Sequence, residues 1–570
     1  MKISIARTAG FCMGVRRAVD MVLDASNKAK EPIYTYGPLI HNPQVLEMLE
    51  SKQIFRLDKI PESGKGIVLI RAHGVPPQDE KALADAGFTV LNATCPRVVR
   101  VQVIIDKYSK KGYDTVILGD EKHPEVIGLL GYARGKGHTI TSVEQLSALP
   151  RFEKAVVVAQ TTQNTKIFAD IKAWCRSNAP HYEIFNTICD STEKRQNEVR
   201  EMAETHDAVI VVGGKFSGNT KRLAQVAAET GKPSMHIEEA SEIDYSSLSH
   251  VQSIAITAGA STPNWIINDT CCRVGQAFRE KRPGRKKVMA VLDVLMKANI
   301  ILAAGAAALT LGTAMISGVE NPGIPAVISM FYILSMQIMN NMMTLGSDTY
   351  NKPDRAALYK ENKIWLLLLA FLSGAAGLYL AWTRGWGYFS VLLIMMLLGM
   401  SYNRTIIPPV SRSRIKIYRI KDVPGSKTIL IAAAWGIVTS LMPGLSFDAN
   451  FGLTLIAFIF ATGLAFARTA FMDILAVQGD RIAGRETLPI LLGKKKTLNL
   501  VRYTLVAAII IPLILSIWMS GVICGLSVIP AVMLILIFRH KKDNDISANF
   551  YEFWFEIPLL FAALVAAVGL

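Results

Sequence analysis

The chain has 570 residues, of which 51% are hydrophobic, so it is too long for one hydrophobic core and too apolar for an ordinary soluble protein. Its formal net charge is +16. In the second half, however, Lys and Arg lie almost wholly between apolar runs, and the densest basic group spans residues 412–421. Charge placed this way is typical of loops beside a bilayer. We therefore expect membrane lipid, and no nucleic acid, as a partner.

The composition changes at a basic segment, residues 279–287, which predicts a linker between two domains. Residues 1–278 alternate charged, polar and apolar positions, as a globular domain does. The chain opens with a strand-like segment and without a signal peptide, so we expect this first domain in the cytoplasm. Residues 288–570 instead contain repeated apolar runs, which predict an all-α membrane domain.

Nine apolar runs are present, most of them near the ~20 residues that a spanning helix needs. They cover residues 288–316, 323–343, 363–382, 386–401, 427–443, 450–470, 500–519, 522–538 and 552–570. With the first domain inside, the inward loops carry nearly all the Lys and Arg, while the outward loops carry only Arg384. We expect nine helices in a bacterial inner or cell membrane, with the C-terminus outside.

Three cysteines of the first domain share one local pattern. Cys12, Cys95 and Cys189 each follow a short strand-like run and open a helix-like one. A thiolate at a helix N-terminus is favoured by the helix dipole and by free backbone N–H groups, which lower its pKa. Three such thiolates can hold a strongly anionic cluster. Seven cysteines in a chain expected in the cytoplasm argue against a disulfide framework, and the absence of a CxxC pair argues against structural zinc.

The spacing around these cysteines repeats three times. His41 follows Cys12 by 29 residues, while His123 follows Cys95 by 28 and Ser217 follows Cys189 by 28. Each repeat has a second polar loop after a further apolar strand, and these loops contain His73, Thr161 and Ser261. Strand–loop–helix units predict parallel sheets whose loops gather at the strand C-terminal ends. We expect an α/β fold of three units, about 1–93, 94–187 and 188–278, in a pseudo-threefold arrangement around a central site.

The motifs of the first domain resemble those of the LytB/IspH family. They are Gly10-Phe-Cys-Met-Gly-Val15, Arg71-Ala-His-Gly-Val75, Ala93-Thr-Cys-Pro96, His123-Pro-Glu125 and Thr257-Ala-Gly-Ala-Ser261, in order from residue 1 to about 278. The resemblance implies a 4-hydroxy-3-methylbut-2-enyl diphosphate reductase of the non-mevalonate isoprenoid pathway. It also implies a trefoil around a [4Fe–4S] cluster, with three irons bound by Cys12, Cys95 and Cys189 and a fourth open for the substrate hydroxyl.

Such a reaction needs a Lewis acid on the hydroxyl, two electrons and two protons. The family motif makes Glu125, beside His123, our candidate proton donor, and a dry pocket that raised its carboxyl pKa would suit that role. The catalytic residues that we expect are Glu125, His123 and Thr161. The resemblance further implies that Thr161 contacts the hydroxyl and that a set of polar residues binds the diphosphate, namely His41, His73, His123, Ser217, Asn219 and Ser261. Gly218, between Ser217 and Asn219, is a small departure. The family expectation for the electron donor is a ferredoxin or flavodoxin.

The second domain resembles the UbiA-type intramembrane prenyltransferases, in which two aspartate-rich motifs hold Mg²⁺ on a prenyl diphosphate. The residues that this resemblance assigns to the metal and diphosphate are Asn340, Asp348, Asp473 and Asp480, which we place in inward loops. The sequence departs from the pattern at Asn341, Thr344 and Ala476, where the family has aspartates. The sequence is compatible with an active prenyltransferase and equally with a domain whose prenyl-transfer activity is altered or lost.

Two other interpretations compete with a reductase fused to a domain that uses, binds or localises its isoprenoid product. One is a membrane prenyltransferase with an accessory cluster domain. The other is a membrane-anchored redox sensor with a labile cluster. The complete motif set of residues 1–278 favours the reductase, since the transferase motifs have lost acids while the reductase motifs have not.

Overall fold

The computed structural model describes residues 2–29, 31–248, 250–279, 286–401, 425–445, 449–485, 487–542 and 548–569. The chain divides into two compact units, residues 1–281 and 282–570. The basic group at 412–421 and most of the segment 279–287 lie outside the described residues.

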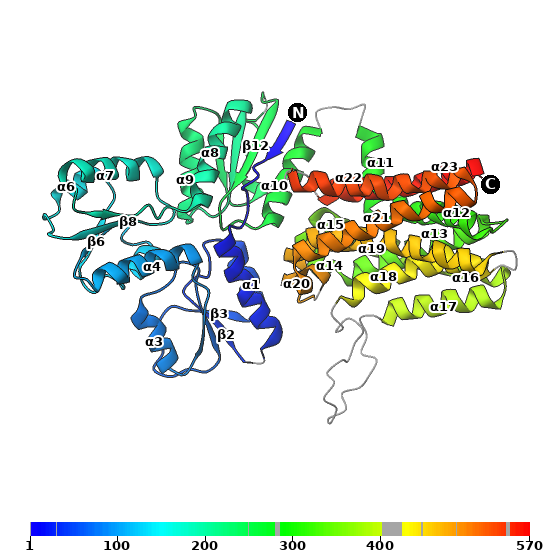
Figure 1. Cartoon of the computed structure of the whole chain (residues 1–570), viewed down its shortest axis with the longest axis horizontal. Coiled ribbons are helices and arrows are strands. Elements are labelled where there is room, and N and C mark those ends of the chain that lie inside the picture. Colours follow the sequence, from blue (N-terminus) through cyan, green and yellow to red (C-terminus); the bar gives the residue numbers. More distant parts are fainter. Residues whose placement is uncertain are drawn as a thin grey trace. The chain divides into compact units, whose positions relative to one another are not determined.

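The first unit contains three four-stranded parallel sheets, which occupy separate lobes in Figure 1. One sheet has the order β3-β2-β4-β5, with β2 (Ile33–Tyr36), β3 (Ile54–Leu57), β4 (Ile67–Ile70) and β5 (Thr89–Asn92). The next has the order β7-β6-β8-β9, with β6 (Asp114–Leu118), β7 (Gly137–Ile140), β8 (Ala155–Ala159) and β9 (Glu183–Ile184). The third has the order β1-β12-β10-β11, with β1 (Lys2–Ile5), β10 (Ala208–Val212), β11 (Ser234–Ile237) and β12 (Ser253–Ala258).

The three sheets have one topology. The edge strands β5, β9 and β1 each lead into a cysteine, and each pairs with the strand that carries the second polar loop, β4, β8 or β12. The first strand of the chain therefore completes the third sheet, with Ile3 opposite Ile254. The strands β2–β5 lie within the predicted unit 1–93, and β6–β9 lie within 94–187. The third sheet takes β10–β12 from 188–278 and β1 from the start of the chain.

Helices cover the sheets because their central strands are apolar on both faces, as in β8 and β10, where every residue is buried. The helices are α1 (Met13–Lys28), α2 (Pro43–Ser51), α3 (Pro77–Asp85), α4 (Pro96–Ser109), α5 (Pro124–Leu130), α6 (Val143–Ala148), α7 (Thr165–Asn178), α8 (Asp190–Thr205), α9 (Gly218–Glu229), the short η1 (Ala240–Glu242) and α10 (Asn264–Arg279). Parallel strands direct their C-terminal ends, and the loops that follow, to one edge of each sheet.

The second unit is helical throughout its described residues. Its first half contains α11 (Lys286–Lys297), α12 (Ile300–Ser317), α13 (Gly323–Met343), α14 (Leu345–Asn351), α15 (Pro353–Glu361), α16 (Lys363–Thr383) and α17 (Trp386–Ser401). Its second half contains α18 (Ser426–Gly436), η3 (Ile437–Leu441), η4 (Pro443–Leu445), α19 (Phe451–Ile482), α20 (Leu488–Leu492), α21 (Lys494–Trp518), η5 (Gly521–Ser527), α22 (Val528–Lys542) and α23 (Ala548–Gly569).

Seven helical segments among the described residues are long and apolar enough to cross a membrane. Two shorter apolar helices, Trp386–Ser401 and Ser426–Leu441, correspond to the fourth and fifth expected runs. The unit is thus a membrane domain, and the count of nine spans stays a prediction. The first expected run, 288–316, is not one helix. It breaks at Asn299, whose φ of 61° places it in the left-handed region that Asn tolerates.

The expectation that both acidic motifs lie in loops is wrong. Asn340 and Asn341 lie in α13, Asp348 lies in α14, and both Asp473 and Asp480 lie inside α19. Helix α19 runs twelve residues beyond the apolar run 450–470, because no proline or helix-ending turn interrupts it. Residues seven apart lie on the same face of a helix, so α19 presents its two aspartates together.

Candidate functional site

Each of the three cysteines stands directly before a helix. Cys12 caps α1, and its Sγ accepts a hydrogen bond from the backbone N–H of Val15 at 3.5 Å. Cys95 precedes α4, where Pro96 fits the first turn because that turn needs no N–H donor. Cys189 precedes α8. All three thiols therefore lie at the positive ends of helices, as the sequence predicts.

The backbone of each cysteine is fixed by the same contact. The N–H of Cys12 donates to the carbonyl of Ala260 at 3.1 Å, that of Cys95 to Ala72 at 2.9 Å, and that of Cys189 to Thr161 at 2.9 Å. These three acceptors belong to the second polar loops, after β12, β4 and β8. The sheet pairing thus places every cysteine beside a loop that carries one predicted site residue.

The three thiols lie near one another. Burial raises the pKa of the Cys95 thiol, and the neighbouring Cys12 and Cys189 raise it further. The expectation of a lowered pKa is therefore wrong for Cys95, because desolvation outweighs the hydrogen bonds offered at the start of α4. Gly14 makes room for this thiol, since a Cβ there would lie 2.5 Å from the Sγ of Cys95.

A buried arginine that the sequence reading missed ties the cysteine loops together. Arg195 of α8 is 3% exposed and donates to the carbonyls of Gly10 at 2.7 Å and Ala258 at 2.9 Å. Its guanidinium also interacts electrostatically with Cys12 and Cys189. A buried cation of this kind offsets negative charge gathered on the thiols. The sequence signal that could have revealed it is an arginine on the apolar side of a helix that opens at a cysteine, since an unpaired arginine is rarely buried.

Three histidines meet at a second location. The ring centroids of His41 and His73 are 5.2 Å apart, those of His73 and His123 are 5.4 Å apart, and those of His41 and His123 are 6.2 Å apart. They come from the loops after β2, β4 and β6, so two sheets build the cluster. Their ring nitrogens converge within 4.8 Å, close enough to contact one small anionic group.

Burial keeps these imidazoles neutral. It lowers the pKa of His123 to about 4 and that of His73 well below its usual range, and the pKa of His41 also falls. Arg71, which stands in a family motif but had no role assigned from the sequence, adds a positive charge that lowers all three pKa values. An anion bound here would raise these pKa values again, because it favours the protonated rings.

The third sheet contributes the remaining polar residues. The hydroxyl of Ser261 lies 3.2 Å from the carbonyl of His41 and 3.3 Å from the hydroxyl of Ser217. Asn219 is 6% exposed, and its Nδ2 has no hydrogen-bond partner among the described residues. A Cβ at Gly218 would lie 3.8 Å from Nε2 of His123, so this glycine keeps open space beside the imidazole. The buried Nδ2 of Asn219, which lacks a partner among the described residues, is suited to an anionic ligand.

Glu125 and Thr161 form the fourth element of the site. Glu125 is 1% exposed, and its two oxygens accept hydrogen bonds from the backbone N–H and the hydroxyl of Thr161, at 2.7 and 2.8 Å. Burial raises the pKa of Glu125 to about 7, although both hydrogen bonds oppose the rise. The carboxyl is therefore poised to exchange a proton near neutral pH.

The residues predicted for the first unit thus fall into four groups, namely the thiols, the imidazoles, the polar residues of the third sheet and the Glu125–Thr161 pair. Thr161 accepts from Cys189 and donates to Glu125, while Ala72 accepts from Cys95 beside His73. The three thiols stand at helix N-termini, and the buried Arg195 guanidinium interacts with two of them, Cys12 and Cys189. This arrangement fits an anionic iron–sulfur cluster.

The four predicted residues of the second unit line one cavity of about 100 Å³. Asn340 and Asp348 come from the α13–α14 region, and Asp473 and Asp480 come from α19. The cavity is also lined by side chains that the sequence did not single out or that we placed among the Lys and Arg of the inward loops. They are the cations Lys352, Arg355, Lys427, Arg468 and Arg485, and the carboxylate Glu552.

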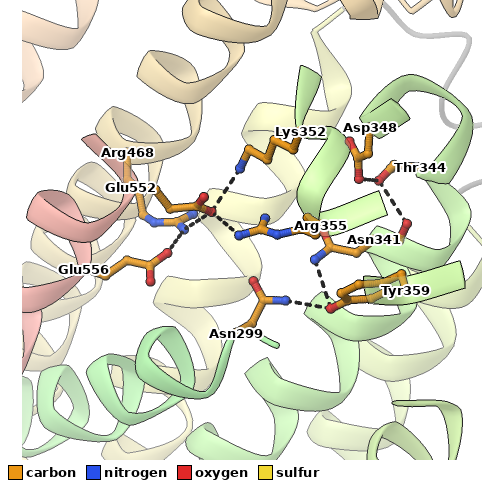
Figure 2. Close-up of polar contacts among 10 residues, drawn as sticks. All are labelled: Asn299, Asn341, Thr344, Asp348, Lys352, Arg355, Tyr359, Arg468, Glu552 and Glu556. Atoms are coloured by element: carbon orange, nitrogen blue, oxygen red, sulfur yellow. Dashed lines mark hydrogen bonds and ion pairs between the residues drawn. The ribbon is translucent and has the colours of Figure 1, made fainter. Parts of the chain in front are cut away.

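Figure 2 shows how three of these cations surround Glu552 of α23. Lys352 and Arg355 donate to its Oε1 at 3.0 and 2.8 Å, and Arg468 of α19 lies 4.0 Å from the same oxygen and also pairs with Glu556. Glu552 and Glu556 are both almost fully buried. Charges inside the apolar runs 450–470 and 552–570 were the sequence signal for this network.

Comparison with known proteins assigns each unit to a family. The LytB protein family model matches residues 3–274, and the UbiA prenyltransferase family model matches residues 300–557. A curated 4-hydroxy-3-methylbut-2-enyl diphosphate reductase of Geobacter sulfurreducens is 41% identical over 284 residues, which is all of that protein and 50% of this chain. The chain belongs to the LytB family through its first unit, and its second unit is a UbiA prenyltransferase family domain.

Solved structures match the two units separately. A structure of (E)-4-hydroxy-3-methyl-but-2-enyl diphosphate reductase is 38% identical, covering 48% of this chain and 100% of that one, with a TM-score of 0.40. A UbiA homolog from Archaeoglobus fulgidus bound to GPP and Mg²⁺ is 15% identical, covering 48% of this chain and 98% of that one, with a TM-score of 0.34.

Proposed function

We propose that the first unit removes the hydroxyl of (E)-4-hydroxy-3-methylbut-2-enyl diphosphate reductively, releasing isopentenyl and dimethylallyl diphosphate. The single observation that carries this proposal is the buried Glu125–Thr161 pair, in which the carbonyl of Thr161 accepts a hydrogen bond from the backbone N–H of Cys189. A neutral-pH proton donor beside a set of cluster-binding thiols is what a reductive loss of hydroxide requires. The 41% identity to a curated reductase over that protein's whole length supports the assignment.

Cys12, Cys95 and Cys189 would hold the [4Fe–4S] cluster, which when bound supplies electrons and Lewis acidity toward the hydroxyl. The chain's own contribution is to position these thiols at the starts of α1, α4 and α8 and to offset their charge with Arg195. A small ferredoxin or flavodoxin is the proposed electron donor.

The diphosphate would be bound by the three imidazoles and by the polar residues of the third sheet. His41, His73 and His123 offer converging ring nitrogens, and Asn219 offers a buried donor that lacks a partner among the described residues. Ser217 and Ser261 extend the same surface through their mutual hydrogen bond. Because the rings are neutral when the site is empty, binding an anion would draw protons onto them.

Glu125 would supply protons to the reaction. Loss of the hydroxyl as water consumes two electrons and two protons, one for the departing oxygen and one for the allylic carbon. With a pKa of about 7, Glu125 is substantially protonated at neutral pH and can give up its proton without a large barrier. Thr161 would orient both the carboxyl and the substrate hydroxyl, since its own hydroxyl lies 2.8 Å from Glu125.

The second unit would keep this chemistry at a membrane. We place the first unit on the cytoplasmic side and the C-terminus outside, on the basis of the Lys and Arg in the inward loops. An isoprenoid product released there is a building block for longer prenyl diphosphates. Fusion to a UbiA family domain is consistent with use of that product nearby.

The proposal is tested with the full-length chain, purified anaerobically in detergent. It should show an iron–sulfur absorption band and consume the hydroxylated diphosphate when a one-electron donor is added. Cys95→Ser should remove both the band and the activity. Cys175→Ala is the matched control, because Cys175 is a buried residue of α7 in the core beside the second sheet, and it should keep both. A colourless wild-type chain after reconstitution, or a coloured one without turnover, would contradict the proposal.

A further inference from the structure

The polar cavity of the second unit carries more positive than negative side chains. Among the described residues that line it, five are cationic and four are carboxylates. A site for divalent metal ions normally has the opposite balance, because the metal needs an excess of anionic oxygen ligands. The positions where the UbiA resemblance expects further aspartates are occupied by Asn341, Thr344 and Ala476.

Two of these three side chains, Asn341 and Thr344, form hydrogen bonds with other residues of the second unit. Asn341 donates to the hydroxyl of Tyr359 at 3.1 Å, a hydroxyl that also accepts from Asn299 at 3.0 Å (Figure 2). The hydroxyl of Thr344 donates to Asp348 at 2.7 Å. These contacts use side chains that would otherwise face a metal ion, so the first motif no longer presents a set of free oxygens.

A lysine of the chain lies where the remaining carboxylates meet. The ammonium of Lys427 lies 3.5 Å from Oδ1 of Asp473 and interacts electrostatically with Asp480 and Asp348 as well. The other oxygen of Asp473 accepts from the hydroxyl of Thr428 at 2.7 Å. All the acids retained from both motifs therefore face one tethered positive charge.

Two further cations that line the cavity, Arg485 and Lys352, have N–H donors that their carboxylate partners do not use. Arg485 lies 3.9 Å from Oδ1 of Asp480, a loose pairing that leaves most of its five N–H donors unused by that carboxylate. Lys352 donates to Glu552 and has two further donors. The side chains of Lys352, Lys427 and Arg485 are 19, 22 and 25% exposed, whereas their ion-pair partners Glu552, Asp473 and Asp480 are 4, 5 and 3% exposed. Asp348 is the one half-buried carboxylate among the described lining residues, so most of the accessible charge in the cavity is positive.

Arg355 adds a buried N–H donor to the lining of the cavity. Its side chain is 8% exposed, and its Nε has no hydrogen-bond partner among the described residues although its guanidinium lines the cavity. A buried N–H group without a partner is costly, and an oxygen-rich anion would satisfy it.

We propose that the ammonium of Lys427 takes the place of a divalent metal ion, so that the second unit binds a diphosphate group directly through Lys352, Lys427 and Arg485. The ligand is a diphosphate ester of an isoprenoid alcohol or inorganic pyrophosphate, since both offer the same anionic oxygens. This inference concerns the second unit alone and does not depend on the reductase activity proposed for the first.

The test measures equilibrium binding to the full-length chain in detergent, with EDTA and then with Mg²⁺. The probes are dimethylallyl diphosphate, geranylgeranyl diphosphate and inorganic pyrophosphate, which separate a small ester, a long ester and the bare anion. Binding that is lost in Lys427→Met reports on the second unit, whatever the first unit binds. We expect Lys427→Met to weaken that component at least about tenfold and EDTA to leave it unchanged in the wild type.

A matched control is Lys297→Met, because Lys297 also pairs with carboxylates of the second unit but does not line the cavity. It should bind every probe as the wild type does. Arg485→Gln is a second cavity variant, whose loose ion pair makes misfolding less of a concern, and it should weaken the same component. Lys427→Arg should retain binding, because it retains the charge.

Metal binding supplies the reciprocal measurement. Without the tethered ammonium, Asp348, Asp473 and Asp480 lack their shared counter-charge, so Lys427→Met should bind Mn²⁺ more tightly than the wild type in an electron paramagnetic resonance titration. The proposal is overturned if the component sensitive to Lys427 requires Mg²⁺, if no such component exists, or if the wild type binds Mn²⁺ at least as tightly as Lys427→Met.

Discussion

Both carboxylate oxygens of Glu125 accept hydrogen bonds from a single residue, Thr161, at 2.7 and 2.8 Å. The two residues lie 36 positions apart: Glu125 is in the first turn of α5, which follows β6, and Thr161 is in the loop after β8, the neighbour of β6 in the same sheet. The pair therefore exists because the parallel register brings these two segments together. It ties the proton donor to the residue whose carbonyl accepts from Cys189.

Glu125→Gln should abolish turnover while leaving the iron–sulfur absorption intact, because glutamine keeps the shape of the side chain but supplies no proton. In the wild type, kcat should fall as pH rises through about 7, where the carboxyl loses its proton. A pH series of kcat and absorption spectra for both chains checks this. Retained turnover in Glu125→Gln would refute the role of Glu125.

The same pKa has a consequence for stability. Because the folded-state pKa is raised from 4.5 to about 7, protonation stabilises the fold below pH 4.5, and that contribution is lost as pH rises through 7. The full loss is of order 3 kcal/mol. Glu125→Gln avoids it, so its melting temperature should exceed that of the wild type at pH 8 more than at pH 5. Equal differences at both pH values would contradict the raised pKa.

Thr161→Val should move the alkaline limit of activity to higher pH. It removes the hydroxyl that donates to Glu125 and leaves the backbone N–H, and a lost donor raises the pKa of the carboxyl further. Thr161→Ser retains the hydroxyl and should keep the limit of the wild type. The position of the limit, and not the absolute rate, is the measurement. An unchanged limit in Thr161→Val would show that the hydroxyl does not set this pKa.

Gly14→Ala should reduce the amount of cluster per chain, because the added Cβ would lie 2.5 Å from Sγ of Cys95. Gly275→Ala is the control, since a Cβ there meets only Ile3 at 3.8 Å, an ordinary contact. Iron and sulfide analysis of both reconstituted chains makes the comparison. Equal iron content would mean that α1 shifts to accommodate the methyl group.

Arg195→Gln should lower the reduction potential of the reconstituted cluster. The guanidinium lies near Cys12 and Cys189, and a nearby positive charge favours the more negative, reduced state. Arg195→Lys should recover part of the potential, because it restores the charge without both hydrogen bonds to Gly10 and Ala258. Spectroscopic redox titration gives the values. An unchanged reduction potential in both variants would show that the charge of Arg195 does not affect the cluster and that its role is confined to the hydrogen bonds with Gly10 and Ala258.

In the second unit, Glu552→Gln should destabilise more than Arg355→Gln. Loss of Glu552 leaves Lys352 and Arg355 buried without their counter-charge, at a cost of about 3–5 kcal/mol, whereas loss of Arg355 leaves Glu552 with Lys352. The double variant should melt at a higher temperature than Glu552→Gln alone. Thermal unfolding in detergent gives the order. Strictly additive effects would show that the two charges do not interact.

The amino-acid sequence was enough to predict two domains and to propose the chemistry of the first. Cysteines before helices, repeated spacings and the Glu125 motif are local patterns, so they can be read without knowing which strands pair. Apolar run length likewise identified the membrane unit, because the bilayer sets the length of a spanning helix.

Which residues lie together could be known from the folded chain alone. The pairing of β1 with β12 places the first strand of the chain in the third sheet, and burial, which depends on every neighbour, raises the pKa of Cys95 against the helix dipole. The meeting of Lys427 with Asp473, on helices distant in sequence, is likewise a property of helix packing. Long-range contacts set these features, and no pattern within one segment encodes them.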